Sequence, residues 1–442
     1  MKKRILFVII SIVLMFSLSG CEMVTFNVSE LMSPPKATGE KAAIQELIEK
    51  EAGSGYTLKY PQNGNYRSSV TTMDFDSDNT EEAIVFYVPS GETQTVHMLI
   101  MDYVDGEWIS LGNYPSKSST VDRLVFSDLD GDGVKEIIVG WSTTYNSLIN
   151  DLSVYLVSDK SSTEITSENK YTDFLCGSFT GAGKEEILLL SLYTTEKNAS
   201  ATLIGLNDTK NSLYALGETP IDADVTAFKK LQTGNVYSEQ FGAVIDGETS
   251  EGAYNTQIIY YSNYFESLER VSFTGDSPTN QKIRNYAVLS EDIDGDGIIE
   301  IPNTFKMNID DAQTDAVPAA HIHWCQYNSL GQMTVEKIQA ASLVYGCRFT
   351  IPDNWSNNYT AYVNYSTNEI TFYEWNNTEN KLGQALIIIK MFPHNLWTDG
   401  TSAGGYTELA RNDSYVYSFI TVETNSSMLP TNEEIIKAFS LT

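Results

Sequence analysis

The chain has 442 residues, with 58 Asp and Glu against 28 Lys and Arg, which gives a formal net charge of −30 at pH 7. A surface this acidic repels nucleic acid and anionic membranes, so we exclude nucleic acid as a partner. Only three cysteines follow Cys21, too few for a disulfide framework. We expect Cys176, Cys325 and Cys347 to be buried free thiols, with a Cys325–Cys347 disulfide as the alternative.

The N-terminal segment has the pattern of a secretion signal. Residues 2–4 are basic, residues 5–18 are apolar except for two serines, and Leu18-Ser19-Gly20-Cys21 follows. The apolar stretch is shorter than the roughly 20 residues of a membrane-spanning helix. The last four residues resemble the lipobox of bacterial lipoproteins. The resemblance implies that residues 1–20 are a cleaved signal peptide and that Cys21 is lipidated. Residues 21–41 would then be a flexible tether, holding the protein outside the cytoplasm on a bacterial cell membrane. An uncleaved anchor or an ordinary signal peptide is the alternative.

Residues 42–341 are predicted to form one repetitive β domain that begins with a helix. The helical pattern covers residues 42–52, with Ile44, Leu47 and Ile48 on one face and Gly53 after its end. We expect this face to pack on the β domain, and a helix that binds a partner is the alternative.

Three acidic nine-residue turns each precede an apolar strand. Turn 74 (residues 74–82), turn 128 (residues 128–136) and turn 292 (residues 292–300) carry Asp at positions 1, 3 and 5 and Gly or Asn at position 6. Hard oxygen ligands that converge in this way suit Ca²⁺; position 7 would add a backbone carbonyl and position 9 a carboxylate. An EF-hand is excluded because its position 12, which should be Glu, is Val139 in turn 128 and Asn303 in turn 292. Hairpin turns without a metal are the alternative.

The turns belong to a repeat of about 50 residues. Turns 74 and 128 begin 54 residues apart, and a degenerate copy, turn 178 (residues 178–186), begins 50 residues later. Turn 178 keeps Glu186 at position 9 but lacks the three Asp residues, so we expect no metal there. A fourth unit (residues 223–273) has the strands without the turn, and a fifth begins near Arg284. This pattern predicts an all-β β-propeller of about five four-stranded blades, or six or seven if a blade has diverged. A β-sandwich array is the alternative.

The repeated turn and its flanking strands resemble the FG-GAP/VCBS repeats of integrin-α-type propellers, in which this turn binds Ca²⁺. The resemblance implies structural Ca²⁺ at two or three sites. Each ion would be held by four carboxylates and the carbonyl at position 7. The implied ligands are Asp74, Asp76, Asp78, Thr80 and Glu82 in turn 74, Asp128, Asp130, Asp132, Val134 and Glu136 in turn 128, and Asp292, Asp294, Asp296, Ile298 and Glu300 in turn 292.

Residues 342–442 have a different pattern and are predicted to form a small α+β domain. Several β-branched and aromatic runs predict strands, and Thr431 with Glu434 makes a capping box for a final helix over about residues 432–439.

The sequence contains no nucleophile elbow, zinc-protease, P-loop or dinucleotide-binding motif. His321 and His323 lie on one face of a predicted strand, either as a pair of metal ligands or as two structural histidines. The acidic residues outside the turns show no further cluster. We therefore predict a binding or scaffold module for a protein or glycan ligand, not an enzyme. The alternative is a carbohydrate-active enzyme with an active site in the propeller channel. Two carboxylates that converge in the channel, away from the turns, would exclude the binding-only hypothesis.

Overall fold

The computed structural model describes residues 40–144, 147–158, 160–195, 197–273, 283–310, 315–397 and 403–442. The predicted signal peptide, the lipidation site Cys21 and nearly all of the tether lie outside these residues. Within the described part, every helix is too short or too polar to cross a membrane. Its first element is helix α3 (Glu40–Ala52), which packs Ile44, Leu47 and Ile48 against the first sheet, as predicted.

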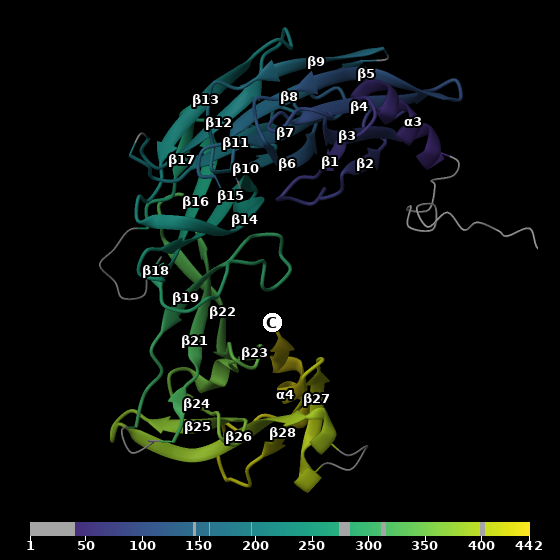
Figure 1. Ribbon diagram of the computed structural model, residues 1–442. Coiled ribbons are helices and arrows are strands. Elements are labelled where there is room, and N and C mark those ends of the chain that lie inside the picture. Colours follow the sequence, from purple (N-terminus) through teal and green to yellow (C-terminus); the bar gives the residue numbers. More distant parts are fainter. Residues whose placement is uncertain are drawn as a thin grey trace, which may run out of the picture.

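The described strands form six antiparallel sheets. In Figure 1 the sheets follow one another along an arc, with α3 near one end and the C-terminal sheet at the other. The first blade contains β1 (Thr57–Lys59), β2 (Val70–Met73), β3 (Glu82–Val88), β4 (His97–Val104) and β5 (Glu107–Pro115). The second contains β6 (Thr120–Ser127), β7 (Glu136–Ser142), β8 (Asp151–Ser158) and β9 (Ser161–Thr166). The third contains β10 (Asp173–Gly177), β11 (Glu186–Ser191), β12 (Ser200–Leu206) and β13 (Leu213–Pro220).

The remaining sheets continue the arc. The fourth blade contains β14 (Val225–Tyr237), β15 (Gln240–Thr249), β16 (Tyr254–Ser262), β17 (Ser267–Arg270) and β18 (Ile283–Arg284). The fifth contains β19 (Ile301–Phe305), β21 (Ala320–Tyr327), β22 (Met333–Ser342), β23 (Cys347–Thr350) and β29 (Phe439–Leu441). The C-terminal sheet contains β20 (Val317–Pro318), β24 (Tyr359–Asn364), β25 (Glu369–Asn376), β26 (Lys381–Pro393), β28 (Tyr415–Thr421) and β27 (Thr407–Arg411). The other helical segments are η1 (Asp353–Trp355), η2 (His394–Leu396), η3 (Ala403–Gly405) and α4 (Asn432–Ala438).

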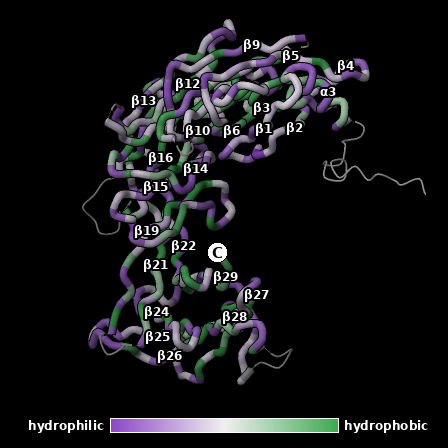
Figure 2. The backbone as a smooth tube through the Cα atoms, viewed as in Figure 1, coloured by the Kyte–Doolittle hydropathy of each residue, from purple (hydrophilic) through white to green (hydrophobic). Residues whose placement is uncertain are grey.

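The strands that follow turns 74, 128 and 178 lie in the interior of their blades. β3, β7 and β11 are buried along their whole length. Successive side chains of a strand point to opposite faces, so an unbroken apolar run requires cover on both faces. In Figure 2 hydrophilic segments gather at the hairpin tips around the rim, and apolar segments run through the body of the arc.

That cover comes from the neighbouring blades. One apolar cluster joins the first and second blades, where Phe86 meets Trp141 edge-on at 5.9 Å between ring centroids. Similar clusters join the second to the third blade, the third to the fourth and the fourth to the fifth. A four-stranded sheet cannot bury both of its faces alone, so the blades stabilise one another by stacking. The predicted fold class, a β-propeller followed by a small α+β region, is confirmed.

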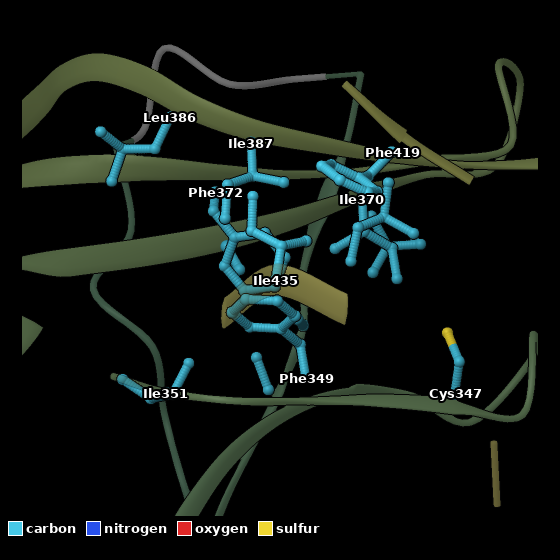
Figure 3. Packing of buried hydrophobic residues seen from close by; sticks show 14 of the residues in the cluster. Cys347, Phe349, Ile351, Ile370, Phe372, Leu386, Ile387, Phe419 and Ile435 are labelled. Atoms are coloured by element: carbon cyan, nitrogen blue, oxygen red, sulfur yellow. The ribbon is translucent and has the colours of Figure 1, made fainter. Parts of the chain in front are cut away.

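The C-terminal sheet packs on the fifth blade through the largest apolar cluster. Figure 3 shows Phe349 of β23 beside Phe372 and Ile387 of the C-terminal sheet, with Ile435 of α4 against them. The capping box predicted for α4 is present, because Thr431 and Glu434 bond reciprocally. Strand β23 pairs with β22, and β29 pairs with β23. The division of the chain at residue 342 stays a prediction.

The three cysteines of the described part, Cys176, Cys325 and Cys347, are free thiols. Cys325 and Cys347 are buried, as expected for thiols with a packing role, whereas Cys176 is half-buried.

Candidate functional site

The acidic turns share one backbone framework, which their Asp side chains hold. In turn 128 the amide of Gly133 donates to Oδ2 of Asp128 at 3.0 Å, and that of Asp132 donates to Oδ1 of Asp130 at 3.1 Å. Turns 74 and 292 repeat both bonds. The residues expected to offer a carbonyl, Thr80, Val134 and Ile298, donate their amides to the Asp at position 5 at 2.7, 2.9 and 2.8 Å. Positions 4 and 6 have positive φ throughout, which explains the Gly at these positions of turns 128 and 292.

This framework brings most of the expected ligands together. Oxygen atoms of Asp74, Asp76, Asp78 and Glu82 lie within 4.8 Å of one another, as do those of Asp128, Asp130 and Glu136, and those of Asp292, Asp294 and Glu300. Asp132 and Asp296 lie outside these groups. The turns therefore form three acidic clusters with the donor atoms to hold a metal ion.

The Glu at position 9 has a second role in folding the turn. Its Oε2 accepts the amide of position 2, as Glu82 does from Phe75 at 2.9 Å and Glu136 from Leu129 at 2.7 Å. Turn 178 keeps this bond, between Glu186 and Phe179 at 2.8 Å. Burial raises the pKa of both Glu82 and Glu136 to about 7, because an ionised carboxylate loses its hydration there.

The degenerate turn 178 shows how the second Glu oxygen is satisfied without a metal. There the hydroxyl of Thr180 donates to Oε1 of Glu186 at 2.5 Å. In turn 74 position 3 is Asp76, which offers no donor, and Oε1 of the fully buried Glu82 has no hydrogen-bond partner in the described structure. A buried carboxylate oxygen without a donor is costly, and a cation in the cluster would remove that cost. The residues present thus fit a bound metal.

Neighbouring turns are joined directly through their backbones. The amide of Lys135 in turn 128 donates to the carbonyl of Phe75 in turn 74 at 2.9 Å. The amide of Glu185 in turn 178 donates to the carbonyl of Asp128 at 2.8 Å. The turns of the first three blades therefore form a continuous row.

A separate polar centre lies where the first strands of the second, third and fourth blades meet. These strands, β6, β10 and β14, lie on the inner side of the arc in Figure 1. A cavity of about 210 Å³ opens between them, and we call it the channel pocket. Polar side chains of the pocket include Gln62, Asn63, Thr120, Ser142, Asn150 and Thr172. A larger cavity of about 660 Å³ continues from it and shares Asn63, Arg123, Asp173 and Phe228.

Two carboxylates converge on one guanidinium in the channel pocket. Nε of Arg123 lies 3.1 Å from Oδ2 of Asp122, and its Nη1 lies 2.5 Å from Oδ1 of Asp173. Asp122 also accepts hydrogen bonds from the hydroxyl of Tyr171 and the amide of Asn63, each at 2.7 Å. The side chain of Asp173 is 23% exposed and that of Asp122 only 6%, so Asp173 is the carboxylate that a ligand reaches. Burial raises the pKa of Asp173, and Arg123 partly offsets that effect.

This centre corrects the expectation that the acids outside the turns form no cluster. Asp122 and Asp173 belong to different blades, and only the stacking of β6 on β10 brings them together. The sequence does contain one indication of this centre, which is an acidic residue in the strand that precedes a turn. Asp122 lies six residues before turn 128, and Asp173 lies five residues before turn 178.

The two histidines on β21 are structural. His321 and His323 have ring centroids 4.7 Å apart, and Nε2 of His321 lies 2.6 Å from the hydroxyl of Tyr359. Burial lowers the pKa of His321 to about 3 and that of His323 to about 4, so both are neutral at pH 7. In the described part of the chain no Cys, Asp or Glu completes a group of three ligands with them.

No protein-family model and no curated protein matches the sequence. Among solved structures, the chain is similar to a provisionally assigned 6-phosphogluconolactonase from Bacteroides uniformis at 16% identity, covering 75% of this chain and 92% of that one with a TM-score of 0.32. It is also similar to the periplasmic gluconolactonase of Pseudomonas aeruginosa, at 10% identity, 75% and 88% coverage and a TM-score of 0.31. A rhamnogalacturonan lyase aligns at 13% identity, 79% and 73% coverage and a TM-score of 0.31. Similarity at this level transfers no activity to the chain.

The prediction of a binding or scaffold module that is not an enzyme is contradicted. The similar solved structures that carry a functional name are named as enzymes, which states their function and not that of this chain. In addition, Asp122 and Asp173 converge on Arg123 away from the turns. That arrangement meets the criterion stated above against the binding-only hypothesis, and the sequence did not reveal it because the two carboxylates are distant in sequence.

Proposed function

We propose that this protein is a carbohydrate-active enzyme with its active site in the channel pocket. One observation carries the proposal, which is that Asp122 and Asp173 converge on Arg123 in a cavity lined by hydroxyl and amide side chains. Such side chains pair with the hydroxyl groups of a sugar, and they fix its orientation. Cleavage of a bond to a sugar ring uses two carboxyl groups, one of which supplies a proton.

We assign the proton transfer to Asp173. Burial raises its pKa, which keeps a larger share of the group protonated near neutral pH, as a proton donor requires. Asp122 has a different environment, since Tyr171, Asn63 and Arg123 all donate to it. We assign it the role of orienting Arg123, whose positive charge would face the leaving oxygen as its bond to the sugar breaks. Asp173 would protonate that oxygen, and water that adds to the sugar carbon would return a proton to Asp173.

The test is turnover of a panel of polysaccharides, oligosaccharides and aldonolactones. Asp173→Asn keeps the shape of the side chain but cannot supply the proton, so kcat should fall about 10²- to 10⁴-fold. The matched control is Asp105→Asn, at an exposed hairpin turn with φ of 52°, a conformation that Asn adopts readily. A panel without turnover, or turnover that Asp173→Asn leaves unchanged, refutes the proposal.

We also propose that the acidic clusters bind Ca²⁺ with a structural role, as the resemblance to FG-GAP/VCBS repeats implies. The donor sets are entirely oxygen, and the unsatisfied Oε1 of Glu82 supports a cation in turn 74. With millimolar Ca²⁺ and dissociation constants of about 10⁻⁴–10⁻³ M, each ion would add about 0.4–1.4 kcal/mol to the free energy of unfolding. Thermal melting in chelator and in millimolar Ca²⁺ measures this stabilisation. Identical melting temperatures under the two conditions would contradict the proposed Ca²⁺ binding.

Finally, we propose that the protein is a bacterial lipoprotein, anchored outside the cytoplasm through Cys21. The lipobox and the preceding apolar segment support this. Metabolic labelling with a fatty-acid analogue should label the wild type, whereas Cys21→Ser should abolish the label and the membrane association. Label that persists in Cys21→Ser rules the anchor out.

A further inference from the structure

The three acidic clusters differ in what lies against their carboxylates. In turn 128, Nζ of Lys210 pairs with Oδ2 of Asp130 and lies 3.0 Å from Oδ2 of Asp132. The Oδ1 atoms of both residues accept amides of the turn itself. Lys210 therefore contacts the oxygens that the turn leaves open for a cation.

Lys210 comes from another blade and is held in place by its own hairpin. It lies between β12 and β13 of the third blade, with φ of 50°, a left-handed conformation that Lys rarely adopts. Oδ1 of Asn207 accepts the amides of Asn211 at 2.9 Å and Ser212 at 3.2 Å, and the amide of Lys210 donates to the carbonyl of Asn207 at 2.8 Å. An ordered hairpin thus presents the ammonium group to turn 128.

In the other two clusters no lysine or arginine of the described residues pairs with a carboxylate of the cluster, and the ammonium of Lys337 contacts turn 292 only at the backbone carbonyl of Ile293, at 2.5 Å. In turn 292, Nε2 of Gln326 donates to Oδ2 of Asp296 at 2.9 Å and to Oε1 of Glu300 at 2.7 Å, and it carries no charge. In turn 74, Oε1 of Glu82 has no donor, and the neighbouring Asp102 adds negative charge. The carboxylates of turn 128 therefore contact a cation, those of turn 292 contact an uncharged amide, and Oε1 of Glu82 in turn 74 has no hydrogen-bond donor.

We propose that Lys210 is a built-in cation that competes with Ca²⁺ for turn 128. This inference rests on the proposed calcium binding and deepens it. Without Ca²⁺, Lys210 neutralises the repulsion among Asp128, Asp130 and Asp132. Ca²⁺ enters only when the ammonium leaves, so metal binding is coupled to release of the hairpin of the third blade. The affinity for Ca²⁺ should accordingly be highest at turn 74 and lowest at turn 128.

The experiment compares Lys210→Met with Lys229→Met by calorimetric titration of Ca²⁺. Lys229 pairs with Glu248, which belongs to none of the acidic clusters, and is the matched control. Both substitutions are made in a background with Asp74→Asn and Asp294→Asn, each of which keeps the single turn amide that the carboxylate accepts, and turn 128 stays as the intact cluster. Lys210→Met should raise the affinity about fivefold, equivalent to about 1 kcal/mol. It should also lower the melting temperature in chelator, because the carboxylates then repel one another.

The outcomes separate this inference from the calcium proposal. If the wild type with all three turns intact does not bind Ca²⁺, calcium binding itself is refuted. If the wild type binds Ca²⁺ but Lys210→Met leaves the affinity of turn 128 unchanged in the background that isolates this turn, only the role of Lys210 is overturned. An equal gain in Lys229→Met would show a general effect of surface charge and would also overturn it.

Discussion

The substitution Glu82→Gln tests the acidic turns most directly, because its effect should change sign when metal is added. The side chain is fully buried, and its Oε2 accepts the amide of Phe75 at 2.9 Å. Burial is the largest cause that raises its pKa to about 7, and the charges of Asp76 and Asp102 add to it. Gln keeps the shape and the acceptor for Phe75 but removes the charge.

The magnitude follows from the difference in proton affinity between the folded and unfolded chain. Glu82 has a pKa of about 7 when folded and 4.5 in the reference state, so the folded form binds the proton more tightly. Stability from this group is present in full below pH 4.5 and is lost as the pH rises to about 7. The difference corresponds to roughly 3 kcal/mol for the metal-free protein. Glu136, whose pKa burial also raises to about 7, contributes in the same direction.

At pH 8 without metal, Glu82→Gln should therefore raise the free energy of unfolding, by up to about 3 kcal/mol. In millimolar Ca²⁺ the same variant lacks a charged ligand and should be less stable than the wild type. Urea unfolding of the wild type and the variant at pH 5 and at pH 8, each with metal-free and with calcium-loaded protein, measures the difference in the free energy of unfolding under all four conditions. The difference between the metal-free proteins should shrink at pH 5. Equal destabilisation by Glu82→Gln with and without Ca²⁺ at pH 8 would refute the reasoning.

Two further predictions concern the fourth blade and the channel pocket. Asp246→Ala leaves the fully buried guanidinium of Arg284 without the carboxylate 2.8 Å away, so the free energy of unfolding should fall by about 3–5 kcal/mol. The double variant Asp246→Leu with Arg284→Met should lose less free energy of unfolding than the two single variants combined. Losses that add up in chemical denaturation would contradict this. Gly140→Ala places a methyl group on the hydroxyl of Tyr171, at a cost of about 1–3 kcal/mol, and should displace that hydroxyl from Asp122. Turnover should then fall to the level of Tyr171→Phe, and full activity would show that this contact is not part of the site.

The repeat could be predicted from the sequence because its information is local. Within nine residues, Asp side chains accept the amides of the turn and Gly provides positive φ, so the turn needs no distant partner. The apolar run that follows each turn requires cover on both faces, which predicts stacked blades. The capping box of Thr431 and Glu434 is equally local, and it marks the start of α4.

The channel pocket could not be predicted in the same way. Asp122 and Asp173 lie on β6 and β10, and their distance depends on how two blades stack. Lys210 reaches turn 128 across a separation of 78 residues, and no local pattern marks that contact. The turns were therefore found as motifs, whereas their neighbours and the channel carboxylates depend on tertiary packing.

The row of turns affects how the blades come apart. The amides of Lys135 and Glu185 are each bonded to the preceding turn, so both are protected from exchange with solvent while adjacent turns stay in contact. In a linear array each unit communicates only with its neighbours. Hydrogen exchange at these two amides would thus report the loss of contact between turns 74 and 128 and between turns 128 and 178. A substitution that loosens the packing of α3 should therefore speed hydrogen exchange at the amide of Lys135 before it affects the amide of Glu185.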